Sequence, residues 1–259
     1  MTLAGPCRIA WAAFLTTTFM LLTPPQLASA QDVDLELLLA VDVSPSVSTE
    51  EYVLQIRGLA EALRNPDVVN AITAAAPNGV AIALMQWAGP REQTVSVPWS
   101  EVRDQATAVA FAEKVSAITR PPTNGGTAIG DALVRGILLL AENSFQGARQ
   151  IIDISGDGRT NQGDSPAPVR ADAAMSGITV NGLVILNEEP QLGSYYLARV
   201  IGGPGAFVLQ VDDFEDFALA IRLKLIREIE VAMVASSSAG DGVSVLLSAV
   251  DSGYLQQHQ

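Results

Sequence analysis

The feature of this sequence that most constrains its fold is an alternation of short apolar runs with longer amphipathic stretches. Apolar runs of strand length occupy residues 35–42, 79–88, 93–99, 149–158, 178–186 and 206–211. Apolar residues at helical spacing occupy residues 49–65, 100–118, 127–143, 165–177, 193–201 and 213–233. Because parallel strands are joined only through crossover connections, this alternation predicts a mostly parallel sheet. We therefore expect a doubly wound α/β fold with helices on both faces of the sheet.

One pair of apolar runs departs from this alternation. Residues 79–88 and 93–99 are separated only by a short turn around Gly89 and Pro90. Two strand-like runs joined in this way are typical of a β-hairpin. The pair is therefore expected to add one antiparallel edge strand to an otherwise parallel sheet.

Polar residues mark two of the expected helix starts. Ser48 or Thr49 is the expected cap of the helix after the first strand, and Glu50 and Glu51 are favourably placed in its first turn. Ser100 is the expected cap of the helix at 100–118.

The N-terminal segment has the pattern of a secretory signal peptide. Arg8 precedes an apolar stretch at 9–22, and small residues end at Ala30, before Gln31. This stretch is shorter than the roughly 20 residues that a membrane helix needs, and two prolines follow it. We therefore expect residues 1–30 to be removed and the protein to be exported, either periplasmic or secreted. The alternative is an N-terminal membrane anchor, which would also place the domain outside the cytoplasm.

The rest of the chain is expected to form one domain and a tail. Residues 31–235 have the length of a single α/β domain with ample core. The composition changes at residue 236, and we interpret 236–259 as a flexible tail or an added edge element. Its apolar part, 243–250, is too short to span a membrane, so no transmembrane helix is expected in the mature chain.

Composition excludes several classes of function. The chain has 15 Lys and Arg residues against 28 Asp and Glu residues, a net charge of −13, so its surface should repel nucleic acid. The sole histidine, His258, lies next to the C-terminus, which argues against a Ser-His-Asp triad or a His-ligated zinc site. The sole cysteine, Cys7, lies in the expected signal peptide, so the mature chain would have no disulfide.

Oxygen-bearing side chains follow the first apolar run, which reads LELLLAVDVSPS. Asp42 ends the run, and Ser44 and Ser46 follow at alternate positions. In open α/β sheets ligands bind outside the carboxyl ends of the strands, where loops carrying Thr127 and Asp157 should also lie. Two carboxylates and three hydroxyls are the donors that a hard divalent cation prefers. The sequence therefore predicts a cation site made by three loops.

This arrangement resembles the metal-ion-dependent adhesion site of von Willebrand factor type A (VWA) domains, the fold also called the integrin I domain. The family pattern is Asp-x-Ser-x-Ser, then a threonine on a second loop, then an aspartate in an Asp-Gly turn after the fourth strand. Here these are Asp42, Ser44 and Ser46, then Thr127 in GGTAIGDAL, then Asp157 in GDG. The resemblance covers about residues 33–233 and is closest to secreted bacterial proteins of uncharacterised function.

The resemblance implies a binding function rather than catalysis. Mg²⁺ is the expected cation, with Mn²⁺ or Ca²⁺ as alternatives, and it would keep an open coordination position for an acidic side chain of a partner. The expected partner is thus a protein or ligand that presents a carboxylate. One departure from the family is Gly156, where relatives often have a threonine that bears on hydrogen bonding around the site.

Two other functions stay open. In a haloacid-dehalogenase-type phosphotransferase, Asp42 would be the nucleophile and Asp212 or Asp213 would help to bind Mg²⁺. That family normally has an aspartate where this chain has Ser44. Alternatively, the domain scaffolds a cell-envelope assembly through its tail or sheet edge, and the metal is purely structural.

Several further residues could be taken for ligands, but each has a structural interpretation that we favour. Asp153, inside an apolar strand, is expected to be held by hydrogen bonds. Asn124, Arg159 and Asn161 are expected mainly to form turns. Helix capping accounts for the acidic residues Asp212, Asp213, Glu215 and Asp216. Core packing accounts for the apolar stripe Phe217, Ile221, Leu225 and Ile229.

Overall fold

The computed structural model describes Met1 and residues 30–230. Its elements are β1 (Gln31–Asp42), α1 (Thr49–Arg64), α2 (Pro66–Ala75), β2 (Val80–Trp87), β3 (Gln93–Val102), α3 (Gln105–Ser116), α4 (Ile129–Glu142), β4 (Phe145–Gly156), α5 (Pro166–Met175), β5 (Ile178–Ile185), α6 (Leu192–Arg199), β6 (Val208–Val211) and α7 (Phe217–Glu230). The tail expected at 236–259, and all of the expected signal peptide except Met1 and Ala30, lie outside the described residues. Within the described part, no helix is both long and apolar enough to cross a bilayer.

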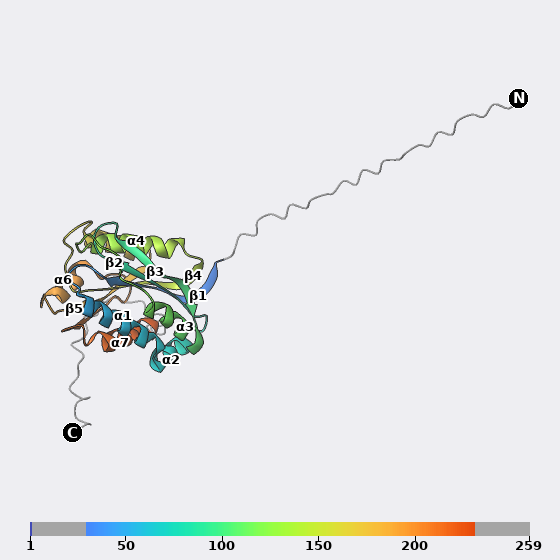
Figure 1. Cartoon of the computed structure of the whole chain (residues 1–259), viewed down its shortest axis with the longest axis horizontal. Helices are drawn as coiled ribbons and strands as arrows, with labels where there is room; N and C mark the ends of the chain where they lie inside the picture. The colour runs from blue at the N-terminus through green and yellow to red at the C-terminus, as the bar shows by residue number, and fades with distance from the viewer. Residues whose placement is uncertain (2–29, 231–259) are drawn as a thin grey trace, which may run out of the picture.

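The sheet has the order β3-β2-β1-β4-β5-β6, and β1 lies inside it (Figure 1). Only β2 and β3 pair antiparallel, and all other neighbours are parallel. In β1, Leu37 is aligned with Ile82 of β2 and with Ile151 of β4. The predicted doubly wound α/β fold with one antiparallel edge strand is confirmed.

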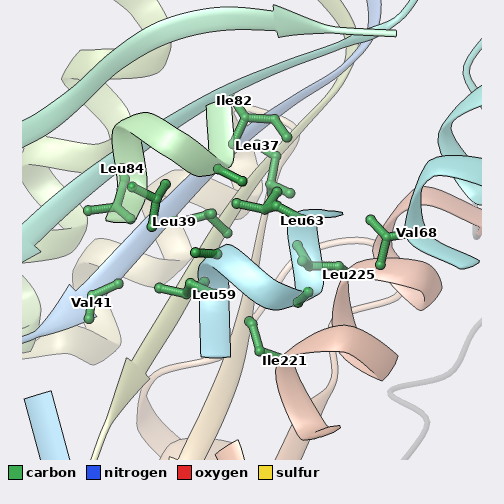
Figure 2. Packing of buried hydrophobic residues seen from close by; sticks show 14 of the residues in the cluster. Leu37, Leu39, Val41, Leu59, Leu63, Val68, Ile82, Leu84, Ile221 and Leu225 are labelled. Atoms are coloured by element: carbon green, nitrogen blue, oxygen red, sulfur yellow. The ribbon is translucent and has the colours of Figure 1, made fainter. Parts of the chain in front are cut away.

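Helices cover both faces of the sheet, which explains why β1 is apolar at successive positions. Leu37 and Leu39 point toward α1 and α7, and Figure 2 shows them packed near Leu59 of α1 and Leu225 of α7. Helices α2 and α3 belong to the same layer. On the other face, Leu38 packs in a second core with α4, α5 and α6. Both cores pack against β1 and fix its position. The start of the loop that follows Asp42 is therefore fixed as well.

Several element boundaries follow the sequence and others do not. Ser48 caps α1 as predicted, and its capping box with Glu51 satisfies two backbone N–H groups. The proposed cap Ser100 is wrong, because that residue continues β3 beside Ile82, and α3 is capped instead by Asp104. Pairing with β2 outweighs the local helical pattern there.

Helix α2 was not predicted from the sequence. Pro66 comes soon after α1 and would normally be expected to interrupt a helix. Here it lies in the first turn of α2, where the backbone N–H that proline lacks would have no partner within the helix. Asn65 ends α1 and caps α2, since its side chain accepts a hydrogen bond from the N–H of Asp67. Val68 and Ile72 are buried and anchor α2 in the core.

Candidate metal centre

Three loops meet at the carboxyl ends of β1, β2 and β4. Asp42 is the last residue of β1, and Asp157 follows β4, which is the neighbour of β1. The loop that carries Thr127 is held against β2 by a hydrogen bond from the N–H of Ala128 to the carbonyl oxygen of Ala88. The order of the strands thus brings distant parts of the chain to one place.

Hydroxyl groups connect the first loop to the third. The Oγ atoms of Ser44 and Ser46 are 3.1 Å apart, and Ser46 Oγ donates a 2.7 Å hydrogen bond to Asp157 Oδ1. Ser44 and Asp157 are buried, whereas Ser46 is partly exposed. The expected ligands Ser44, Ser46 and Asp157 therefore lie together at the border between core and solvent.

Asp42 is fully buried, and in the described part of the chain only one of its two carboxylate oxygens makes a hydrogen bond. Oδ1 accepts a 2.7 Å hydrogen bond from the N–H of Ser44, while Oδ2 has no hydrogen-bond partner among the described residues. Burial raises the pKa of Asp42 to about 7, and the charge of Asp157 adds to the rise, whereas hydrogen bonds from Ser44 and the charge of Arg120 oppose it. A buried carboxylate in this state gains from a nearby cation.

Asp157 repeats this pattern. Its Oδ1 accepts a hydrogen bond from Ser46, but its Oδ2 is buried and has no partner in residues 30–230. Burial is the largest cause of a raised pKa for Asp157, and the hydrogen bond from Ser46 acts against it. Buried polar atoms are almost always paired in folded proteins, so two orphaned carboxylate oxygens in one loop cluster fit a site for a cation.

Thr127 is positioned by Asn161 from the loop after β4. The N–H of Thr127 donates to Asn161 Oδ1 at 2.8 Å, and its carbonyl oxygen accepts from the N–H of Asn161 at 2.9 Å. Gly125 and Gly126 precede Thr127 with φ angles of 101° and 99°, which side chains rarely adopt. The proposed turn-forming role of Asn161 therefore includes fixing an expected ligand.

Arg120 ties the second loop to the first, a role that was not predicted from the sequence. Its Nη2 donates to the carbonyl oxygens of Val43 and Ser44 at 2.9 and 2.8 Å, and its guanidinium lies 5.8 Å from the Tyr52 ring centroid. No motif pointed to this role, because Arg120 lies in an irregular loop where spacing carries no information.

The family described as "Protein of unknown function (DUF1194)" matches residues 32–233. The chain belongs to this family. None of the curated proteins matches the sequence.

Solved structures share the VWA fold of this chain. Proximal thread matrix protein 1 from the mussel byssus matches with a TM-score of 0.54 and 17% identity over 76% of this chain and 47% of that one. A structure of the same protein "with zinc occupied MIDAS motif" has a TM-score of 0.50 and 19% identity over 80% and 49% of the two chains. The vWF domain of the type V pili tip protein Mfa5 from Porphyromonas gingivalis has a TM-score of 0.52 and 12% identity over 81% and 98%. The chain thus spans about half the length of the mussel protein.

Gly156 is where the VWA domain departs from the usual family sequence, and the structure gives a reason. A Cβ atom at this position would lie 2.8 Å from Tyr196 Oη and 2.9 Å from Asp42 Oδ2. Tyr196 of α6 is fully buried, and its hydroxyl has no hydrogen-bond partner among the described residues. The absence of a side chain at Gly156 makes room for a phenol beside the carboxylate. Sequence reasoning missed Tyr196, because its spacing marks it only as core.

The other residues considered in the sequence have partners that differ from the expected ones. Asp153, expected to be held by hydrogen bonds, instead forms an ion pair with Lys224, and its carboxylate makes no hydrogen bond among the described residues. Asn124 donates to Glu92 from both its backbone and its side chain at 2.7 Å. Arg159 forms an ion pair with Glu189, and its guanidinium lies 4.9 Å from the Tyr195 ring centroid.

The acidic residues before α7 do not approach the site. Asp213 Oδ1 accepts hydrogen bonds from the N–H groups of Glu215 and Asp216 at 3.1 and 3.3 Å. This agrees with the expected capping role, although α7 begins only at Phe217. Strands β4 and β5 separate the end of β6 from the end of β1.

Proposed function

We propose that this VWA domain is an exported binding module that holds a divalent cation and uses it to bind a carboxylate of a partner. The observation that carries the proposal is the pair of orphaned, buried oxygens, Asp42 Oδ2 and Asp157 Oδ2, beside the hydroxyls of Ser44 and Ser46. Residues 31–235 would form the module. Export rests on the signal-peptide pattern of residues 1–30.

The proposed cation ligands are Asp42, Ser44, Ser46, Thr127 and Asp157. Their donors are all oxygen, which favours Mg²⁺, with Mn²⁺ or Ca²⁺ as alternatives. The proposed site has only two carboxylates and relies on hydroxyls for its other ligands. Among the described residues, no three or more His, Cys, Asp or Glu side chains are grouped so that they could form a different metal site, such as one with nitrogen or sulfur ligands. The mussel structure with a zinc-occupied motif supports divalent cation binding in this fold.

The cation would supply the charge that makes binding of an acidic partner favourable. The chain carries a net charge of −13, so without a cation its surface repels a carboxylate. Ser46 is partly exposed and gives the site access to solvent. A matrix protein and a pilus tip protein of the same fold support a role in binding rather than catalysis.

A phosphotransferase is the less favoured function. It would need Asp212 or Asp213 next to Asp42, but Asp213 caps the turn before α7, and β4 and β5 separate the two sites. The other alternative, a scaffold with a purely structural metal, predicts cation binding without binding of a carboxylate.

Titration calorimetry with Mg²⁺, Mn²⁺ and Ca²⁺ tests the proposal on the wild type and on Asp42→Ala and Thr127→Ala. Asp104→Ala is a matched control, because it removes an exposed aspartate that caps α3 far from the site. We expect the control to bind the cation and both site variants to lose binding. An unchanged affinity in Asp42→Ala would refute the assignment.

A second assay distinguishes the proposed binding module from a scaffold with a purely structural metal. The probe is an aspartate-containing peptide, compared with its asparagine counterpart, with Mg²⁺ or with EDTA. A binding module retains the aspartate peptide better and only with Mg²⁺. Equal retention of the two peptides, with cation binding intact, would favour the scaffold with a structural metal.

A further inference from the structure

A second group of ionisable side chains lies inside the domain, away from the candidate metal centre. Asp153 projects from β4, and Lys224 and Glu228 lie one turn apart on α7. Their exposed fractions are 2%, 0% and 1%. Two carboxylates and one amine without solvent are costly unless protons are shared among them. The metal site does not account for these three residues.

The contact between Lys224 and Asp153 is unusual in its geometry. Lys224 Nζ lies 2.5 Å from Asp153 Oδ1, yet neither carboxylate oxygen of Asp153 makes a hydrogen bond in the described part of the chain. The amine therefore touches the carboxyl group without lying in a hydrogen-bonding direction. Such a position brings the nitrogen close to the carboxyl carbon, which is the atom that an amine attacks.

Glu228 is placed to move a proton between these two groups. Its Oε1 accepts from Lys224 Nζ at 2.6 Å and from Asn181 Nδ2 at 2.8 Å, and its Oε2 has no partner among the described residues. Burial raises the pKa of Glu228 to about 7, and the charge of Asp153 adds to the rise, while Lys224 opposes it. A carboxyl group with this pKa can both give and accept a proton near neutral pH.

An aromatic ring and two arginines lie beside the reacting groups. The Phe207 ring centroid lies 5.4 Å from Lys224 Nζ, and the Arg227 guanidinium covers the same ring at 3.9 Å. Arg149 donates to the backbone carbonyl oxygens of Glu228 and Ile229 rather than to the carboxylates. In a dry site, transfer of a proton from the ammonium to the carboxylate converts an ion pair into an amine and a carboxylic acid.

We propose that Lys224 and Asp153 join in an intramolecular amide bond, with Glu228 as the proton carrier. The lone pair of neutral Lys224 Nζ attacks Cγ of protonated Asp153, and a C–N bond forms. Glu228 takes a proton from the nitrogen and delivers one to a hydroxyl of the tetrahedral centre. The C–O bond then breaks, water leaves, and Glu228 ends in its initial state. Atoms and charges balance without an oxidant or other reagent.

The bond would fasten α7 to β4 by a covalent link that reducing agents do not break. It joins residues far apart in the sequence and so restricts the unfolded chain in the way that a disulfide does. Cys7 is the only cysteine of the sequence, so a disulfide within the domain cannot serve this purpose. The inference does not depend on the metal site, because none of its three residues belongs to it.

Mass spectrometry of the full chain, purified from the exported fraction and denatured, tests the bond. We expect a protein lighter by one water molecule than its sequence, after correction for the mature N-terminus. Trypsin should yield one branched species that joins residues 150–159 to residues 223–227, because an acylated Lys224 is not cleaved. Free 150–159 together with free 223–224 as the only products would mean an ordinary ion pair and would overturn the proposal.

Two variants assign the roles. Lys224→Arg keeps the charge but cannot form the amide, so its mass should equal its sequence mass. Glu228→Gln keeps an oxygen for Asn181 but carries no proton, and we expect the branched species to fall at least tenfold while circular dichroism is unchanged. A branched species at wild-type abundance in Glu228→Gln would exclude Glu228 as the proton carrier.

Discussion

Ser46 Oγ donates a 2.7 Å hydrogen bond to Oδ1 of Asp157, linking two loops whose residues are 111 positions apart in the sequence. The link exists because β1 and β4 are neighbours in the sheet, so the loops that leave them start side by side. It fixes one oxygen of Asp157, while the other has no partner in the part of the chain that the structure describes. This hydrogen bond therefore holds the first and third loops of the candidate site together.

From this link we predict the effect of Ser46→Ala. The variant loses one proposed ligand and the contact that orients another, so the affinity for Mg²⁺ should fall by about tenfold to a hundredfold. Titration calorimetry measures the change. Ser48→Ala is the control, since Ser48 caps α1 and its loss should cost about 1 kcal/mol of stability without affecting the cation. Similar losses of affinity in both variants would contradict the prediction.

Arg120 should matter for cation binding although it is not a proposed ligand. Arg120→Lys keeps the positive charge but lacks the planar fork that reaches the carbonyl oxygens of Val43 and Ser44. We expect weaker Mg²⁺ binding, by roughly tenfold, because the first loop loses its fixed position. The exposed Arg57 of α1 provides the control Arg57→Lys. If charge alone mattered, Arg120→Lys would bind Mg²⁺ like the wild type.

Gly156→Ala should damage both the fold and the site. The new methyl group would lie under 3 Å from Tyr196 Oη and Asp42 Oδ2, so the domain should lose about 1 to 3 kcal/mol, measured by urea unfolding. Removal of the hydroxyl in Gly156→Ala with Tyr196→Phe should recover part of this loss. Gly158→Ala is the control, because a Cβ atom there meets only Thr127, at 3.9 Å. No recovery in the double variant would show that Tyr196 is not the obstacle.

The sequence predicted correctly the features that follow directly from the order and spacing of strands and helices. Alternating strands and helices determine a parallel sheet, and a parallel sheet places Asp42 and Asp157 at one edge, so the fold and the neighbourhood of the expected ligands followed from spacing. That these residues bind a cation stays a prediction. The VWA resemblance rested on the same residues and was confirmed by the fold.

What the sequence did not reveal depends on tertiary contacts. Arg120 and Tyr196 act through partners that no local pattern specifies. Lys224 and Glu228 did leave a signal, since both fall at helical spacing on the buried face that carries Phe217 and Ile221. Charged residues on such a buried stripe are rare unless they are paired. Attention to these two residues, rather than to the apolar ones alone, would have pointed to the buried cluster.

The buried position of Glu228 predicts how stability depends on pH. Its pKa is about 7 in the folded protein against an ordinary value of 4.5, so between these values the folded state binds more protons than the unfolded state. The contribution to stability is fully present below 4.5 and is lost as the pH rises through about 7. The free energy of unfolding should therefore fall with rising pH over this window.

Urea unfolding of the wild type and of Glu228→Gln, with EDTA present and between about pH 5 and pH 8, measures this contribution. Asp42 and Asp157 also have raised pKa values and give a slope of the same sign, but both proteins contain them. The difference between the two slopes therefore belongs to Glu228 and its neighbours Asp153, Lys224 and Asn181. We expect the flatter slope in Glu228→Gln, whatever its absolute stability. Equal slopes would mean that Glu228 is ionised in the folded domain.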